Sequence, residues 1–182
     1  GINPTRTGLL DVMTRMGADI QLLNLREEAG EPVADIRVKS AKLRGAAIGP
    51  ELIPRTIDEF PILCVAAAVA EGETIISGAE ELRVKESDRI ATMSAELRAM
   101  GAQITETPDG MVVQGLGTAE GNGRLQAARG RSHGDHRVAM SLAIAGLTAS
   151  APTLIDETAC VETSFPDFHH RLLELAGECK QR

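Results

Sequence analysis

The sequence predicts an α/β (α+β) domain of about three pseudo-equivalent βαβαββ-like units, with buried helices that meet at the centre. Two observations support this fold class. A Met-Gly-Ala segment occurs at residues 16–18 and again at 100–102, and each copy ends an amphipathic stretch and precedes a possible strand. Nearly apolar stretches of helical length follow each copy, and a helix that is apolar on all sides is a buried helix. Surface helices and buried helices therefore alternate with strands.

The first part of the chain predicts a surface helix followed by a hairpin. Apolar residues recur at spacings of three and four over residues 9–16, which is the pattern of an amphipathic helix. Gly17 is expected to end this helix in the left-handed conformation. Residues 20–38 then predict a β-hairpin with residues 27–32 as its loop.

The middle of the chain predicts a complete set of elements. Asp58 precedes an almost wholly apolar run at 62–70, which predicts a buried helix whose first turn Asp58 caps. A strand is expected at 74–76, followed by a second amphipathic helix at 90–100. Residues 104–114 predict a hairpin that turns at its Pro-Asp-Gly segment.

The last part of the chain repeats the same order. Asp135 stands where Asp58 stands in the preceding repeat, at the start of an apolar run at 138–147 that predicts another buried helix. A strand is expected at 153–155, and an amphipathic helix at 165–177 that ends at its Ala-Gly pair.

Composition excludes several classes of function. The net charge of −7 over 182 residues disfavours binding to nucleic acid or to an anionic membrane. No stretch of about 20 apolar residues is present, so no membrane partner is expected. The three cysteines show no metal-ligand spacing and predict reduced thiols in the cytoplasm. The chain starts without Met, at Gly-Ile-Asn-Pro, and reads like the middle of a longer polypeptide.

The densest cluster of charged residues lies at 82–89, just before an amphipathic helix. Lys85 and Arg89 are four residues apart at a helix N-terminus, where backbone N–H groups already favour an anion. Glu86 lies between these cations, in a setting typical of groups that transfer protons. The alternative interpretation is a solvated helix start with exchangeable ion pairs.

A second polar cluster lies at 131–137. Arg137 is on the first turn of a predicted buried helix, which is a costly place for a guanidinium group unless it meets an anion or a cleft. His133 and His136 provide only two candidate ligands, so no metal is expected.

The carboxylates Asp58 and Asp135 both stand at starts of predicted buried helices. For Asp58, a simple helix cap is the alternative to a catalytic role. If the repeats converge, the helix starts surround one pocket that combines cations with carboxylates. Such a pocket suits transfer or elimination on a phosphorylated, carboxylated substrate, and it needs no cofactor.

Five motifs follow one another along the chain. They are Asn-Pro-Thr-Arg-Thr-Gly at 3–8, Ile-Asp-Glu-Phe-Pro at 57–61, Leu-Arg-Val-Lys-Glu-Ser-Asp-Arg at 82–89, Gly-Asp-His-Arg-Val-Ala-Met at 134–140 and Thr-Ser-Phe-Pro at 163–166. Together they resemble the signatures of the 5-enolpyruvylshikimate-3-phosphate (EPSP) synthase family. The resemblance implies that residues 1–182 are most of one domain, in the C-terminal half of a two-domain enolpyruvyl transferase, and that the other domain is absent.

The resemblance also implies an activity for the full-length protein. This is the transfer of the enolpyruvyl group of phosphoenolpyruvate to the 5-hydroxyl of shikimate 3-phosphate, a step of aromatic amino-acid (chorismate) biosynthesis. By motif, the resemblance implies that Asp58 is the base at the hydroxyl and that Lys85 contacts that hydroxyl and the substrates. It implies that Glu86 is the proton donor or acceptor at the methylene. Arg89 and Arg137 are the implied ligands of phosphoenolpyruvate, with Asp135 and His136 beside them. The implied partners are the two substrates and the missing N-terminal half, and the isolated chain is expected to be inactive.

Two positions depart from the pattern of many family members. Glu81 stands where many have Asn, and Thr163 stands where many have Lys, which removes one expected contact to phosphoenolpyruvate. The Thr-Ser-Phe-Pro form resembles the glyphosate-insensitive branch. Two other interpretations remain open: a fragment of the sister transferase that acts on UDP-N-acetylglucosamine, and a non-catalytic half-domain that complements another chain.

Overall fold

The computed structural model describes residues 1–117 and 124–179 and confirms the predicted α/β class. One βαβαββ unit is complete. Its elements are β3 (Ala47–Ile48), α2 (Ile53–Thr56), α3 (Phe60–Val69), β4 (Glu71–Ile76), the 3₁₀-helix η1 (Glu80–Val84), α4 (Arg89–Ala99), β5 (Gln103–Thr107) and β6 (Gly110–Leu116). β3 runs parallel to β4, whereas β4, β6 and β5 are antiparallel neighbours, so the sheet order is β3-β4-β6-β5.

The other two units are partial within the described residues. The first consists of α1 (Gly8–Arg15), β1 (Asp19–Glu28) and β2 (Glu31–Lys39). The last consists of β7 (Arg129–Arg131), α5 (His136–Leu147), β8 (Leu154–Asp156), the 3₁₀-helix η2 (Thr158–Val161) and α6 (Phe168–Cys179), with β7 parallel to β8. The described residues therefore hold one complete unit, the αββ end of a second and the βαβα beginning of a third.

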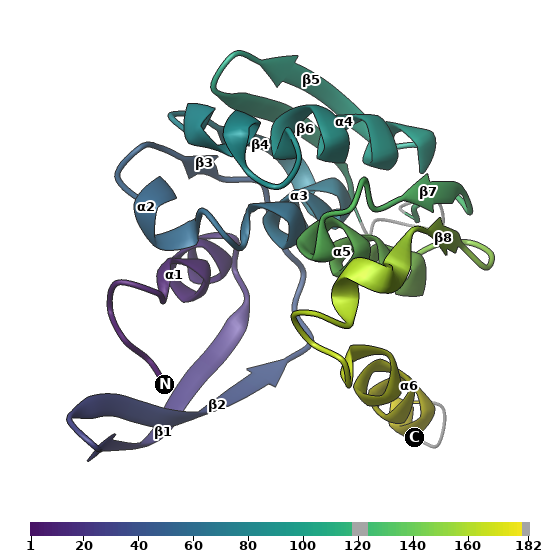
Figure 1. The fold of residues 1–182 in the computed structure, drawn as a ribbon. Helices are drawn as coiled ribbons and strands as arrows, with labels where there is room; N and C mark the ends of the chain where they lie inside the picture. The colour runs from purple at the N-terminus through teal and green to yellow at the C-terminus, as the bar shows by residue number, and fades with distance from the viewer. Residues whose placement is uncertain (118–123, 180–182) are drawn as a thin grey trace.

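The two predicted buried helices form the centre of the molecule. α3 and α5 contact each other, and both contact α4 (Figure 1). Leu63, Cys64 and Ala67 of α3 are at most 2% exposed. The helix passes so close to β6 that a Cβ atom on Gly115 would lie 2.0 Å from the carbonyl oxygen of Ala70. Small and aliphatic side chains thus fill the core, as the low aromatic content requires.

The predicted C-terminal ends of the two amphipathic helices are confirmed for α1 and α4. Gly17 and Gly101 follow these helices with φ angles of 89° and 85°, in the left-handed region that glycine tolerates. The predicted end at the C-terminal helix was wrong, because α6 runs through Gly177 to Cys179. A glycine inside a helix costs only about 1 kcal/mol, so it marks a helix end only where the chain must turn.

The β1–β2 hairpin is the most exposed part of the fold. It turns at Ala29 and Gly30, which both have positive φ angles, so the loop is tighter than the predicted 27–32. In Figure 1 the hairpin and α6 both extend from the body formed by the other elements. Apolar side chains on the hairpin remain in contact with solvent, among them Ile36 at 47% and Val38 at 63% exposure.

Candidate active site

Asp58 lies at the centre of a cluster of arginines. Its Oδ2 atom accepts a hydrogen bond from Nη2 of Arg6 at 2.9 Å and lies 3.4 Å from Nη2 of Arg137. Its Oδ1 atom is 3.7 Å from Nη1 of Arg89. The predicted capping role was wrong, because Glu59 is the N-cap residue of α3 and no side chain caps this helix. The Asp58 carboxylate is held by the three guanidinium groups instead.

The surroundings of Asp58 favour its ionised form. The side chain is 25% exposed, and this burial alone would raise its pKa. The hydrogen bond from Arg6 and the charges of Arg137, Arg6 and Arg89 outweigh burial and lower the pKa below its ordinary value. Asp58 is therefore a carboxylate at neutral pH.

Arg89 connects the carboxylates of the site. It is the first residue of α4, and its side chain is only 1% exposed. Its Nε atom donates to Asp135 at 2.8 Å and its Nη2 atom donates to Glu86 at 2.7 Å. Among the described residues its Nη1 atom has no hydrogen-bond partner, which is costly for a buried donor. An oxygen atom of an anionic ligand would satisfy that donor.

Asp135 is fully buried and fully engaged. Its Oδ1 atom accepts from the backbone N–H of Arg137 and so caps α5, as the sequence predicts. Its Oδ2 atom accepts from Ser87 at 3.1 Å as well as from Arg89. Burial raises the pKa of Asp135, but the hydrogen bond and charge of Arg89, together with the other two donors, lower it below the ordinary value. Asp135 thus holds Arg89 in place.

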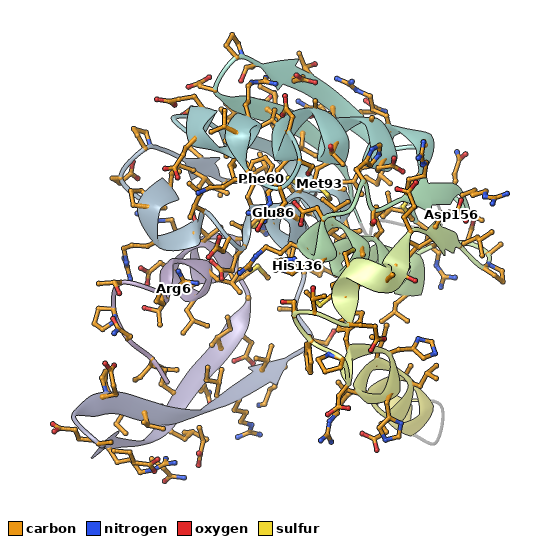
Figure 2. The ribbon with its side chains drawn as sticks, in the orientation of Figure 1. Arg6, Phe60, Glu86, Met93, His136 and Asp156 are labelled. Atoms are coloured by element: carbon orange, nitrogen blue, oxygen red, sulfur yellow. The ribbon has the colours of Figure 1, made fainter. Side chains whose placement is uncertain are left out.

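The three remaining predicted residues lie at the rim of this network. Lys85 follows η1, and its Nζ atom is 2.5 Å from Oε1 of Glu81. Glu86 is half exposed and meets the network through Arg89. His136 is half-buried on the first turn of α5. In Figure 2 the labels of Glu86 and His136 lie near the middle of the view, whereas Asp156 on β8 lies toward its edge.

The site is built from the starts of three helices. Asp58 precedes α3, Lys85 to Arg89 lead into α4, and Asp135 to Arg137 lie at the start of α5. Asp88 caps the N-terminus of α4, because its side chain accepts a hydrogen bond from the backbone N–H of Ala91. This convergence was predicted from the repeats. A hollow of about 200 Å³ lies beside Asp58 and is lined by Asp58, Glu59, Ile62, Arg137, Met140, Ser141, Ile144 and Phe168. Its apolar wall lies next to one cation, Arg137, and the two carboxylates of Asp58 and Glu59.

Arg6 and Ser87 complete the network although the sequence assigned neither of them to the site. Arg6 belongs to the motif at 3–8, but 52 residues separate it from Asp58, and no local pattern links the two. Ser87 belongs to the motif at 82–89, and its hydroxyl donates to Asp135. Among the side chains that the structure describes, at 1–117 and 124–177, no three His, Cys, Asp or Glu are grouped as metal ligands.

The sequence and the fold of this chain are both similar to those of known proteins. Residues 1–172 match the family model of EPSP synthase (3-phosphoshikimate 1-carboxyvinyltransferase). The chain belongs to the EPSP synthase family. The 3-phosphoshikimate 1-carboxyvinyltransferase of Geobacter sulfurreducens is 56% identical over 168 residues, which are 92% of this chain and 38% of that protein.

Solved structures agree with the family assignment. EPSP synthase from Acinetobacter baumannii superposes with a TM-score of 0.87 at 46% identity, over 93% of this chain and 39% of that one. The enolpyruvyl transferase NikO from Streptomyces tendae gives a TM-score of 0.70 at 20% identity, over 94% of this chain and 35% of that one, and so shares the fold.

The match to the EPSP synthase family covers only part of each relative. The chain spans about 40% of the length of the curated relatives that it matches. None of the helices in the described residues has the length and apolar character needed to cross a membrane.

Proposed function

We propose that this chain is most of one domain of a two-domain EPSP synthase. The full-length protein would transfer the enolpyruvyl group of phosphoenolpyruvate to the 5-hydroxyl of shikimate 3-phosphate and release phosphate. The observation that carries the proposal is the convergence of Arg89 and Arg137 on Asp58, which puts a proton acceptor beside two cations. The family match gives this chemistry its substrates.

Asp58 is the proposed base at the 5-hydroxyl. It is ionised at neutral pH, so it can accept a proton as the hydroxyl oxygen bonds to the enolpyruvyl carbon. Lys85 is the proposed contact to the same hydroxyl and to the substrates. Its ammonium group is bound to Glu81, so an anionic substrate competes with that carboxylate.

Glu86 is the proposed proton donor or acceptor at the methylene carbon of the enolpyruvyl group. Its carboxylate is half exposed, so a substrate can reach it, and Arg89 holds one of its oxygen atoms. The protonation of the methylene carbon and its later deprotonation require one group that acts in both directions, as a positioned carboxyl does.

Arg89 and Arg137 are the proposed ligands of the phosphoenolpyruvate anion. The unpartnered Nη1 atom of Arg89 supports this role for Arg89, and the position of Arg137 beside the hollow supports its role. Asp135 and His136 lie next to them at the start of α5, and Asp135 acts by fixing Arg89.

The partner of this domain is proposed to be the rest of the polypeptide. In the complete unit, Met111 and Val113 of β6 are fully buried, and β6 pairs with β4. The equivalent residues of β2 are Ile36 and Val38, because Ile20 pairs with Val38 as Ile104 pairs with Val113. Both are exposed. Among the described residues, the first unit thus has no strand and no apolar helix equivalent to β4 and α3.

The UDP-N-acetylglucosamine alternative is disfavoured by the family match, and titration of both acceptors against the reassembled enzyme tests it. The cytoplasmic location stays a prediction, and the free thiols of Cys64 and Cys160 agree with it.

The test of the proposed function is Asp58→Asn in the enzyme reassembled from this chain and the missing half. The substitution removes the proton acceptor and hardly changes the volume of the side chain. Phosphate release from phosphoenolpyruvate in the presence of shikimate 3-phosphate should fall by roughly 10²–10⁴-fold, the usual contribution of a positioned acid or base. Binding of shikimate 3-phosphate should remain.

Glu59→Gln is the matched control, since Glu59 is adjacent in sequence and, among the described residues, its carboxylate forms an ion pair with Arg137, at 3.9 Å, and not with Arg6 or Arg89. Near-normal turnover by the Asp58→Asn enzyme would refute the role of Asp58. An equal loss in both variants would show that the region is only structurally sensitive.

A further inference from the structure

The segment that carries Arg6 is held by a network of its own. Oδ1 of Asn3 accepts hydrogen bonds from the backbone N–H of Thr5 at 3.0 Å and from its hydroxyl at 2.8 Å. The backbone N–H of Arg6 donates to the carbonyl oxygen of Asn3 at 2.9 Å. Such local bonds from an Asn side chain build a turn of fixed shape.

Arg55 fixes this turn against the rest of the domain. Its Nε atom donates to the carbonyl oxygen of Pro4 at 2.5 Å and its Nη2 atom to the hydroxyl of Thr7 at 3.2 Å. Its Nη1 atom also binds Asp11 on α1 at 2.7 Å. The turn is therefore tied down on both sides of Arg6, although the Arg6 side chain itself is 60% exposed.

Arg6 differs from the other two arginines around Asp58. Within the described residues it alone donates a hydrogen bond to the Asp58 carboxylate, at 2.9 Å. Arg137 lies 3.4 Å from that carboxylate and donates to the backbone carbonyl of Asp58 instead, and Arg89 lies 3.7 Å from it.

The three arginines also differ in how their charge is shared. Arg89 pairs with Asp135 and Glu86, and Arg137 lies 3.9 Å from Glu59. Asp58 is the carboxylate paired with Arg6 in the described part of the chain. An anion bound by Arg89 and Arg137 would compete with Asp58 for these two cations and weaken their interaction with its carboxylate. The hydrogen bond from Arg6 to Asp58 would remain.

We propose that Arg6 is a positioning residue for Asp58, which orients the carboxylate and favours its ionised form. This inference rests on the proposed function for its catalytic meaning, but the effect of Arg6 on Asp58 is a property of this chain by itself. Three cations from three elements face Asp58: Arg6 from the N-terminal turn, Arg89 from α4 and Arg137 from α5. The nearby carboxylates of Glu59 and Glu86 oppose them.

The first experiment measures the pKa of Asp58 in this chain by NMR titration of its carboxyl carbon. Arg6→Gln should raise that pKa, because removal of a cation in contact favours the neutral carboxyl. Arg6→Lys keeps the charge and should restore much of the wild-type value. Arg15→Gln is the control, since Arg15 is a similarly exposed arginine that binds Glu51 and not Asp58.

An unchanged Asp58 titration in Arg6→Gln would overturn the proposal, because a residue that only holds the loop would not alter it. A chemical-shift map of the amides around α3 confirms that each variant is folded before it is titrated. Since this experiment needs no substrate, its result is independent of whether the proposed function is correct.

The second experiment uses the enzyme reassembled with the missing half. Arg6→Gln should lower kcat by roughly two- to fivefold, the range that a partly exposed ion pair supports, and should leave KM for phosphoenolpyruvate unchanged. A rise in KM with unchanged kcat would overturn the positioning role and make Arg6 a substrate ligand. A shifted Asp58 pKa with unchanged kcat would confirm the contact but overturn the positioning role of Arg6 in catalysis.

Discussion

At the scale of single residues, the site depends on one buried guanidinium group. Arg89 is almost fully buried, and it is compensated by Asp135, which has no exposed surface. A buried ion pair of this kind adds little net stability as a pair, but loss of one member leaves an uncompensated charge in the core. The same pair fixes the direction of the Nη1 atom that we assign to substrate.

Asp135→Asn tests this dependence. The amide oxygen can still cap α5, whereas the charge opposite Arg89 is lost, so the free energy of unfolding at pH 7 should fall by about 3–5 kcal/mol. Urea denaturation followed by circular dichroism measures the change. Asp156→Asn is the control, because Asp156 pairs with the exposed Arg129 and should cost at most about 1 kcal/mol.

The loss caused by Asp135→Asn should also depend on pH. The pKa of Asp135 is lowered in the folded protein, so its ionised form stabilises the fold above the ordinary carboxyl pKa. That stabilisation disappears as the pH falls through the folded pKa. The difference between wild type and Asp135→Asn should therefore shrink in acid, and a constant difference across pH would contradict the charge argument.

At the scale of elements, the same order of one helix and two strands occurs in two different environments. In the complete unit, α4 packs against β5 and β6, and α3 packs against β6, where Cys64 of α3 contacts Met111 through their sulfur atoms at 3.6 Å. In the first unit the β1–β2 hairpin has one helix, α1, and no sheet neighbour among the described residues. A two-stranded hairpin with little cover is marginally stable in water.

Hydrogen exchange should separate the two hairpins. Amides of β1 and β2 in the isolated chain should exchange much faster than the paired amides of β4 and β6, because local opening exposes them without unfolding the core. Addition of the missing half should slow exchange in β1 and β2. Equal protection of both hairpins in the isolated chain would mean that the first unit needs no further strand.

At the scale of the whole molecule, folding and catalysis are expected to separate. The central helices α3 and α5 bury their apolar surfaces within this chain, which favours a cooperative fold. Arg6 and Arg137 are partly exposed, although Arg89 is buried. At high dielectric a contact between unit charges about 4 Å apart contributes only about 1 kcal/mol. Closure by a second domain would exclude water and strengthen each contact.

The isolated chain should therefore unfold in one cooperative thermal transition, bind phosphoenolpyruvate weakly or not at all, and release no phosphate. Calorimetry, isothermal titration and a phosphate assay measure these three properties. The missing half, which carries its own share of substrate-binding groups in this proposal, should restore phosphate release when added. Turnover by the purified chain, free of full-length enzyme, would refute the requirement for a second domain.

The sequence by itself determined the local structure and the chemical character of this protein. The 3.6-residue periodicity located α1 and α4, the wholly apolar runs located α3 and α5, and the motifs singled out Asp58, Arg89 and Arg137. These features were predictable because each depends on residues close together in the chain. The same locality explains why Asp58 was taken for a possible cap, since a helix start gives any preceding carboxylate that opportunity.

Only the tertiary structure decided which groups meet. The contacts from Arg6 to Asp58 and from Arg89 to Asp135 join residues 52 and 46 positions apart, and no periodicity or spacing encodes such pairs. The packing of three helix starts around one site brings them together. The same packing surrounds the Asp58 carboxylate with three arginines, whereas the sequence predicted a helix cap. The electrostatic environment of a group is set by its neighbours in space.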